Sequence, residues 1–221
     1  MDHVGADQVV RTAIVVAIDG PAGAGKSTVG RALAERLGLE YLDTGAMYRA
    51  MTFAALRRGV VEGDLADVAA MAPDVDIQVL DGRVTVDGVD ATAVIRGREV
   101  TEAVSQVSAN PAVRAVLVER QREWVAKRGG GVIEGRDIGS VVFPEADLKL
   151  YITASPRVRA ERRVMEIGGD VNEVEVSIIE RDRKDSNREH SPLTETDDAI
   201  VVDTTGLTIE EVLDRILGLI R

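Results

Sequence analysis

The sequence contains no cysteine among its 221 residues. Disulfide bonds, thiolate metal sites and a cysteine nucleophile are therefore excluded for this chain. Histidine is almost as scarce: His3 and His190 are the only two, which rules out a multi-histidine zinc site within one chain. Aromatic residues make up only 3% of the sequence, so Val, Ile, Leu, Ala and Met must build the core.

Long hydrophobic runs and a positive net charge are also missing. The longest early apolar run, residues 13–18, has the length of a strand and is far too short to cross a bilayer. Residues 1–11 contain two Asp and lack a basic region leading into a long apolar stretch, so we expect no secretory signal and a cytoplasmic protein. The formal net charge of −11 argues against nucleic acid or an anionic membrane as the main partner.

The chain alternates strand-like and helix-like segments. Apolar segments of strand length cover residues 13–18, 41–43, 132–133, 148–152 and 200–203. Helical periodicity covers residues 26–37, 44–58, 111–127, 156–167, 171–189 and 209–220, with Thr44 as a possible helix cap. Strands that alternate with helices predict an α/β fold with a parallel sheet covered on both faces.

Residues 73–90 interrupt this alternation. Apolar and polar side chains alternate over residues 75–79 and again over 84–86, with Asp81-Gly82 between them as a turn. This pattern is typical of a β-hairpin. We therefore expect a small inserted subdomain over roughly residues 65–105.

Residues 20–27, Gly-Pro-Ala-Gly-Ala-Gly-Lys-Ser, fit the phosphate-binding P-loop pattern in full. The glycines let backbone N–H groups converge on phosphate oxygens, and the following helix offers its positive N-terminal end. Lys26 can reach the β- and γ-phosphates, and the Ser27 hydroxyl can take a place around Mg²⁺. We therefore expect ATP and Mg²⁺ to bind here, through Gly20, Pro21, Ala22, Gly23, Ala24, Gly25, Lys26, Ser27 and Thr28. The alternative is a glycine-rich turn with a solvated lysine.

P-loops serve many activities, so charged residues elsewhere must discriminate among them. Arg181, Asp185 and Arg188 are spaced i, i+4, i+7, which places them on one face of the expected helix. Guanidinium groups beside a P-loop can neutralise a transferring phosphoryl group. A solvated helix laced with salt bridges explains the same spacing equally well.

A second charged cluster, Glu134-Gly135-Arg136-Asp137, follows a short apolar strand. Ligands gather at the carboxyl ends of parallel strands, so this cluster should face the P-loop. Arg136 can bind a phosphate through two hydrogen bonds, and Asp137 can accept from an exocyclic amine or assist Mg²⁺. The alternative is a charged loop that caps a helix.

Several segments, in order along the chain, resemble bacterial cytidylate kinases. Residues 42–49, Leu-Asp-Thr-Gly-Ala-Met-Tyr-Arg, are similar to the family segment D-[ST]-G-A-x-Y-R. The other matching segments are Ser105-Gln106-Val107 with Pro111 and Arg114, Gly135 to Gly139 with Val141 to Pro144, and Glu180-Arg181-Asp182 through Asn187-Arg188. Two positions depart from the pattern, since Thr44 stands where Ser is common and Glu134 where some relatives carry Asp. Both departures keep the functional group.

The resemblance implies a P-loop NTPase-type, three-layer fold with a five-stranded parallel sheet. Its core would comprise residues 13–64 and 106–221, with an inserted subdomain over residues 65–105 that binds the monophosphate and a short lid over residues 156–170. It also implies a monomer whose partners are small molecules.

The resemblance implies roles for individual residues as well. Arg49 and Arg136 would hold the acceptor phosphate, and Arg188 would lie near the acceptor and transferring phosphates. Thr44 would also belong to the acceptor site. The residues implied in reading cytosine are Ser105, Arg114 and Asp137, those implied in holding the ribose are Arg181 and Asp185, and those of the lid over ATP are Arg159, Arg162 and Arg163.

The resemblance thus implies phosphoryl transfer from ATP to CMP or dCMP, with Lys26, Arg136, Arg181 and Arg188 as catalytic groups. Positioning and charge neutralisation would supply the catalysis, without a covalent intermediate. Uracil would be disfavoured, because Asp137 would then face a carbonyl. The alternatives are a P-loop kinase for UMP, AMP or shikimate, and a nucleotide-dependent switch, although the guanine-reading string Asn-Lys-x-Asp does not occur.

Overall fold

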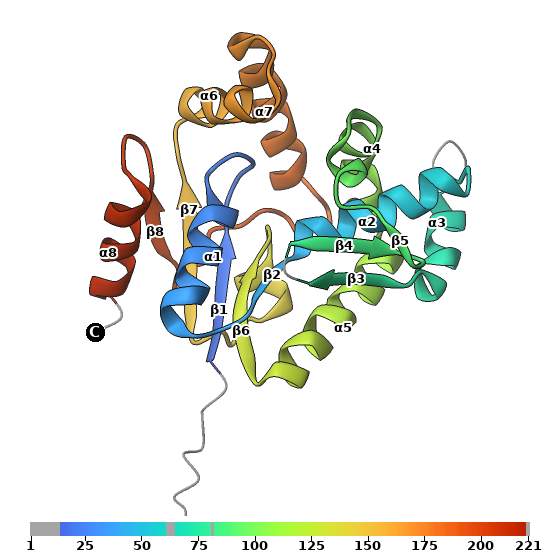
Figure 1. Ribbon diagram of the computed structural model, residues 1–221, viewed down its shortest axis with the longest axis horizontal. Coiled ribbons are helices and arrows are strands. Elements are labelled where there is room, and N and C mark those ends of the chain that lie inside the picture. The colour runs from blue at the N-terminus through green and yellow to red at the C-terminus, as the bar shows by residue number, and fades with distance from the viewer. Residues whose placement is uncertain (1–13, 61–64, 81, 220–221) are drawn as a thin grey trace, which may run out of the picture.

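The computed structural model describes residues 14–60, 65–80 and 82–219. A five-stranded parallel sheet lies at its centre, with the strand order β2-β6-β1-β7-β8 (Figure 1). The strands are β1 (Ile14–Asp19), β2 (Tyr41–Asp43), β6 (Gly130–Glu134), β7 (Leu148–Thr153) and β8 (Ile200–Asp203). Because β1 is the middle strand, the loop that follows it leaves from the centre of the carboxyl edge.

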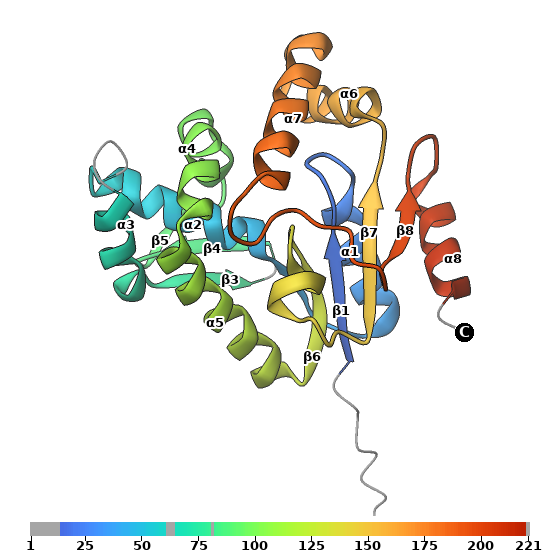
Figure 2. The same cartoon turned by 180° about the vertical axis from the view of Figure 1, so that it is seen from behind.

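Helices cover both faces of this sheet and make three layers. Figure 1 looks at the face covered by α1, and Figure 2 at the face covered by α5. The helices on the first face are α1 (Lys26–Leu37) and α8 (Ile209–Leu219), and those on the second are α2 (Thr44–Arg57) and α5 (Pro111–Arg128).

The side chains of β1 explain why both faces are covered. Val16 and Ile18 lie in the core formed with α1 and α8, whereas Ala17 lies in the core formed with α2 and α5. Successive residues of a strand point to opposite faces, so an apolar run without polar breaks needs a layer on each side. The predicted α/β class and the five-stranded parallel sheet are confirmed.

A second sheet has three antiparallel strands, β3 (Ile77–Leu80), β4 (Arg83–Val86) and β5 (Val89–Asp90). Ile77 pairs with Val86, which confirms the expected hairpin. Of its predicted turn, Asp81 lies outside the described residues, and Gly82 takes a positive φ of 77°. Val84 and Val86 pack into the same core as α2.

Two helices near this sheet were not predicted. They are α3 (Leu65–Met71) and α4 (Arg98–Ala109), and short 3₁₀ turns at Ala72–Asp74 and Val94–Arg96 accompany them. The buried side chains of α4 include Val100, Val104 and Val107, at helical spacing. Polar and β-branched residues between them weaken the helical signal. The predicted boundary between residues 105 and 106 falls inside α4. The division of the chain into a kinase core and an inserted subdomain stays a prediction.

Two expected helix features were wrong. Asp43, not Thr44, caps α2, because its carboxylate accepts a hydrogen bond of 2.9 Å from the N–H of Ala46. Thr44 is the first helical residue. The helix expected over 171–189 ends earlier, as α7 (Val171–Ser186), so Arg188 lies beyond its end.

Two further elements complete the carboxyl edge of the sheet. α6 (Pro156–Ile167) runs as predicted, and a π-helical turn, η3 (Ile138–Val142), follows Asp137 without having been predicted. In Figure 1, α6 and α7 lie over the loop that leads from β1 into α1.

The remaining expectations concern the ends of the chain and the membrane. Residues 1–11, expected to carry no secretory signal, and Ala13 and Ile220, expected to belong to a strand and a helix, lie outside the described residues. Within the described ranges, no helix is both long and apolar enough to cross a bilayer.

Candidate active site

The P-loop, residues 20–27, joins the central strand β1 to α1 at the carboxyl edge of the sheet. Gly20 has φ 142°, and a Cβ built there would lie 2.0 Å from the carbonyl oxygen of Ile152 on β7. Only glycine fits this close approach. Gly25, with φ 90°, is the N-cap of α1, so the positive end of that helix opens into the loop.

Lys26 points back into the loop. Its side chain is buried, and Nζ donates a hydrogen bond of 2.8 Å to the carbonyl oxygen of Pro21. Burial, together with the positive charge of Arg136, lowers the pKa of Lys26, while the carboxylate of Glu134 acts in the opposite direction. Lys26 forms no ion pair with a carboxylate of the described residues, so an anionic ligand would stabilise its charged form.

Ser27 and Glu134 meet beside Lys26. The Ser27 hydroxyl donates to Oε1 of Glu134 at 2.7 Å, and the parallel pairing of β6 with β1 and β2 brings Glu134 there. The second carboxylate oxygen, Oε2, is buried and makes no hydrogen bond within the described residues. Hydroxyl and carboxylate oxygens are the ligands that Mg²⁺ prefers, so this pair fits the expected metal. Glu134 belongs to the cluster that was expected to face the P-loop, but no binding role was predicted for it.

The segment after β6 is fixed by Asp19, the last residue of β1. Its two carboxylate oxygens accept from the N–H groups of Ile138 and Gly139 at 2.8 and 2.7 Å. Burial raises the pKa of Asp19 to about 6. Asp19 therefore ties the start of the π-helical turn to the strand that carries the P-loop.

Asp185 holds two of the predicted arginines together. Its Oδ2 accepts from Nε of Arg136 at 2.9 Å, and its Oδ1 from Nη2 of Arg188 at 2.5 Å. Arg136 also donates to the carbonyl oxygen of Gly20 at 3.0 Å. Burial acts to raise the pKa of Asp185, but Arg136, Arg188 and Arg181 outweigh it, so the pKa is lowered. Both oxygens predicted to hold a ribose are thus paired with arginines here.

Arg181 lies next to this pair. Its Nε is buried and has no hydrogen-bond partner among the described residues. Burial and the positive charge of Arg136 lower its pKa to about 10. Arg181 and Arg136 both depress the pKa of Lys26, which places this positive charge beside the P-loop. A buried guanidinium with a free donor is suited to a phosphate oxygen.

Arg49 extends the positive charge toward α4. Its Nη1 donates to the carbonyl oxygen of Ile95 and to the hydroxyl of Thr101, both at 2.9 Å. Burial lowers the pKa of Arg49 to about 10, and the nearby Arg181 and Arg163 add to this effect. The positive charge of Arg181 is thus coupled to those of Arg49, Arg136 and Arg188, so these four predicted site residues form one cluster.

Arg114 and Asp137, predicted to read a base, form a buried ion pair. The Arg114 guanidinium also lies over the ring of Tyr48, 5.4 Å from its centroid. Burial raises the pKa of Asp137, an effect that Arg114 and then Arg188 oppose. A paired carboxylate and guanidinium present an acceptor and donors side by side.

Thr44 and Ser105 are two other residues that the resemblance implies in binding the acceptor nucleotide. The hydroxyl of Thr44 is buried and donates to the carbonyl oxygen of Glu134 at 2.6 Å, so it fastens α2 to β6. Ser105 is half-buried on α4, but Ser108, one turn later, contacts the arginines: its hydroxyl accepts from Nη2 of Arg188 at 3.0 Å. Ser108 was missed, because a single Ser within a weak helical pattern carries no signal.

The predicted lid arginines differ sharply in exposure. Arg159 is 5% exposed and donates to the carbonyl oxygen of Ala22 at 2.9 Å. Arg163 is half-buried and pairs with the exposed Glu166 at 3.0 Å. In the first turn of α1, Thr28 is exposed.

The sequence comparisons agree with this geometry. A family model described as cytidylate kinase matches residues 16–221. The chain belongs to the cytidylate kinase family. This assignment confirms the resemblance drawn from the motifs.

Individual relatives of the cytidylate kinase family are similar over almost the whole chain. A cytidylate kinase from Streptomyces griseus subsp. griseus is 47% identical, covering 97% of this chain and 95% of the relative. Another, from Geobacter sulfurreducens, is 44% identical, covering 96% and 94%. A bifunctional pantoate ligase/cytidylate kinase from Synechococcus sp. (strain CC9605) is 49% identical, covering 94% of this chain and 45% of that longer protein.

Solved structures share the fold at low sequence identity. A gluconokinase from Sinorhizobium meliloti 1021 gives a TM-score of 0.51 at 15% identity, covering 94% of this chain and 91% of that one. An uncharacterized protein from Eubacterium ventriosum ATCC 27560 gives 0.54 at 12% identity, covering 94% and 98%. At such identities, these likenesses concern the fold alone.

Proposed function

We propose that this member of the cytidylate kinase family transfers the γ-phosphoryl group of ATP to CMP and dCMP, yielding ADP with CDP or dCDP. The observation that carries the proposal is the convergence of two kinds of group beside one P-loop. Arg136, Arg181 and Arg188 offer positive charge around Asp185, and the buried Arg114–Asp137 pair offers a base-reading corner. Family membership makes the chain a nucleoside monophosphate kinase with ATP as its donor.

The donor half of the site uses the P-loop. Its backbone N–H groups and the N-terminus of α1 bind the triphosphate, and Lys26 exchanges its bond to the Pro21 carbonyl for a phosphate oxygen. Ser27 and Glu134 would hold Mg²⁺, which supplies neutralisation of charge on the β- and γ-phosphate oxygens. The protein then only has to align the acceptor.

The acceptor half uses the arginines. The phosphate of CMP lies against Arg49 and Arg136, and one of its oxygens attacks the γ-phosphorus in line with the departing ADP oxygen. Arg181 and Arg188 neutralise the charge on the transferring group, whose transition state is loose. No proton acceptor is needed, because the attacking phosphate oxygen is already ionised.

The base corner explains the proposed choice of acceptor. Asp137 accepts from the exocyclic amine of cytosine, and Arg114 donates to its carbonyl and ring nitrogen. UMP would place a carbonyl against the carboxylate of Asp137, leaving two acceptors face to face at a buried site. The UMP, AMP and shikimate alternatives, and a nucleotide-dependent switch, are not favoured by the family assignment.

Several finer expectations stay predictions: a monomer, no nucleic-acid or membrane partner, a cytoplasmic location, a lid over residues 156–170 and the acceptance of dCMP. The test of the proposed function is ADP release with CMP, dCMP, UMP and AMP compared side by side. We expect rapid release with CMP and dCMP, much less with UMP and AMP, and almost none for Lys26→Ala with any acceptor. Equal release with all four acceptors, or full activity of Lys26→Ala, would contradict the proposal.

A further inference from the structure

The polar backbone groups of Ala22, in the P-loop, are both held from outside the loop. Its N–H donates to Oδ1 of Asp182 on α7 at 3.2 Å, and its carbonyl oxygen accepts from Nη1 of Arg159 on α6 at 2.9 Å. Arg159 and Asp182 are themselves an ion pair, 2.5 Å apart. The Arg159–Asp182 ion pair therefore binds both the backbone N–H and the backbone carbonyl oxygen of Ala22.

The carbonyl oxygen of Ala24 is held in a similar way. It accepts from the hydroxyl of Thr204 at 3.2 Å and from Nη1 of Arg162 at 3.4 Å. Arg162 is fixed in turn, since its Nη1 and Nη2 donate to the hydroxyl and the carbonyl oxygen of Thr204, both at 2.9 Å. The P-loop is thus supported from α6, α7 and the segment after β8.

These contacts decide where the loop amides point. The peptide unit is planar and trans, so the C=O of one residue and the N–H of the next point in opposite directions. The carbonyl of Ala22 points toward α6, and the N–H of Gly23 therefore points away from it. The peptide between Pro21 and Ala22 shows the same alternation. The carbonyl oxygen of Pro21 faces Lys26 within the loop, whereas the N–H of Ala22 faces Asp182 on α7.

We propose that Arg159 and Asp182 are positioning residues, which turn the P-loop amides toward the phosphates of ATP without touching ATP themselves. Arg162 and Thr204 act in the same way on the peptide between Ala24 and Gly25. The proposal rests on the proposed function, since it concerns the same triphosphate site. It revises the role implied for Arg159, which as a lid residue would contact ATP.

The surroundings of the two residues favour positioning over contact. Arg159 is 5% exposed, and its guanidinium already serves the carbonyl oxygens of Ala154 and Ala22 and the carboxylate of Asp182. Asp182 is an anion, and direct contact with a triphosphate would be repulsive. Removing a repulsive neighbour would strengthen ATP binding, whereas removing a support for the loop amides would weaken it. The two roles therefore predict effects of opposite sign.

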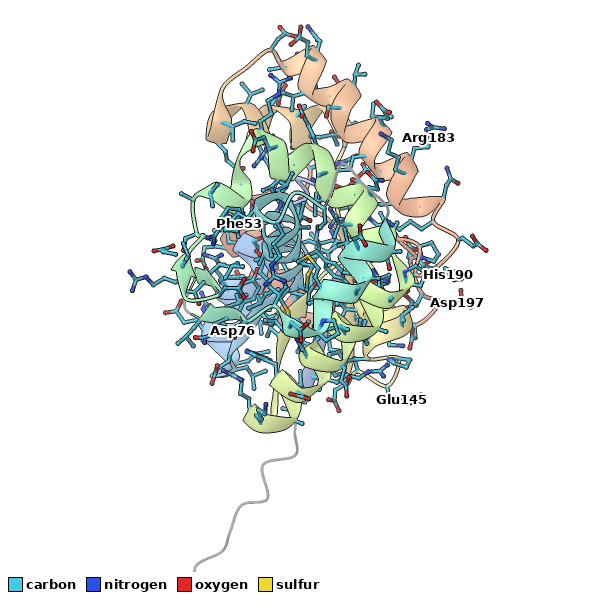
Figure 3. The ribbon with its side chains drawn as sticks, turned by 90° about the vertical axis from the view of Figure 1, so that its right-hand side faces the viewer. Phe53, Asp76, Glu145, Arg183, His190 and Asp197 are labelled. Carbon is cyan, nitrogen blue, oxygen red and sulfur yellow. The ribbon has the colours of Figure 1, made fainter. Side chains whose placement is uncertain are left out.

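Calorimetric binding of ATP, ADP and CMP to the full chain separates these roles. We expect Asp182→Ala and Arg159→Met each to weaken ATP and ADP by similar factors of about tenfold, because a misdirected amide affects the β-phosphate that both nucleotides carry. The affinity for CMP should stay unchanged. Arg183→Ala is the matched control: Arg183 neighbours Asp182 on α7 but projects outward (Figure 3), and its affinities should equal those of the wild type.

Some outcomes would overturn the proposal. They are tighter ATP binding by Asp182→Ala, and a loss of ATP but not ADP affinity in Arg159→Met, which would indicate direct contact with the γ-phosphate. Failure of the wild-type chain to bind ATP would instead contradict the proposed function, so the two failures are distinguishable.

A second readout does not depend on nucleotide binding. Amide hydrogen exchange, followed by NMR on the nucleotide-free chain, should be faster at Ala22 in Asp182→Ala than in the wild type and in Arg183→Ala. If Asp182→Ala does not fold, Asp182→Asn serves instead: its amide oxygen still accepts from Ala22 but has lost its charge, so an intermediate loss of ATP affinity is expected. Unchanged exchange at Ala22 together with unchanged ATP affinity in a folded variant would refute the positioning role.

Discussion

Arg136 and Asp185 form an ion pair of 2.9 Å between two segments 49 residues apart in the sequence. Arg136 comes from the loop after β6, and Asp185 from α7. Since Arg136 also donates to the carbonyl oxygen of Gly20, this pair links both segments to the first residue of the P-loop. Much of the electrostatics of the site depends on Asp185, which is only 1% exposed.

Replacing Asp185 should therefore destabilise the fold. Asp185→Asn leaves the guanidinium groups of Arg136 and Arg188 without their buried counter-charge, and we expect a loss of about 3 kcal/mol at pH 7. Chemical denaturation measures this loss. Glu210→Gln is the control, because Glu210 pairs with Arg36 at 2.8 Å, both side chains are exposed, and the change should alter stability little.

The loss in Asp185→Asn should also depend on pH. The folded-state pKa of Asp185 is lowered by its arginines, so its stabilising effect is complete above the unfolded pKa of about 3.9 and is lost as the pH falls through the folded value. The gap in unfolding free energy between wild type and variant should be constant from pH 6 to 7 and shrink below about pH 4. A gap that stays constant down to pH 2 would show that the charge of Asp185 is not what matters.

The base corner predicts a change in acceptor preference. In Asp137→Asn, a carboxylate that only accepts becomes an amide that can also donate to the exocyclic carbonyl of uracil. We expect the ratio of kcat/KM for CMP over UMP to fall by at least about tenfold, through loss of CMP and gain of UMP activity. Acceptor kinetics at saturating ATP measure this ratio. An unaltered ratio would mean that the base is read elsewhere.

Ser108 and Ser105 offer a matched pair of substitutions on one helix. The hydroxyl of Ser108 accepts from Arg188, whereas that of Ser105 makes no hydrogen bond to an arginine within the described part of the chain. Ser108→Ala should raise the KM for CMP by about threefold to tenfold, because the guanidinium of Arg188 loses one of the partners that hold it in position. Ser105→Ala should have the smaller effect. The reverse order would favour the role that the resemblance implies for Ser105.

Glu134 should set the requirement for Mg²⁺. Glu134→Gln keeps an oxygen that can accept from the Ser27 hydroxyl but removes the negative charge. We expect the Mg²⁺ concentration for half-maximal activity to rise by about tenfold. Binding of ATP in the presence of EDTA should be weakened far less. An unchanged Mg²⁺ requirement would remove Glu134 from the metal site.

The sequence sufficed for features set by local pattern. The P-loop could be read directly, because the spacing of its glycines, Lys26 and Ser27 follows from the geometry of phosphate binding. The central strands and most helices were predicted, since an uninterrupted apolar run and helical periodicity are local signals. Family resemblance then pointed to residues such as Arg114 and Asp137, which the structure places together as an ion pair.

Features that depend on packing between distant segments could not be predicted. The partnership of Ser27 with Glu134 follows from the register of β6 beside β1, which no local pattern reveals. Arg188 reaches Asp185 from beyond the end of α7, although the helical spacing placed both on one helix. Arg159 contacts the carbonyl oxygen of Ala22 and the carboxylate of Asp182, which lie far from it in the sequence, so no local pattern predicts these contacts. In each case the partner is chosen by the tertiary structure.

In the proposed function, one site holds a triphosphate and a cytidine monophosphate end to end. This arrangement can be tested with a bisubstrate analogue in which adenosine and cytidine are joined through five phosphates. Its affinity, measured by calorimetric titration, is compared with those of ATP and CMP alone. We expect the analogue to bind at least about a hundredfold more tightly than either nucleotide, because joining the two makes the second contact intramolecular. Binding no tighter than that of ATP would show instead that the two nucleotides occupy separate sites.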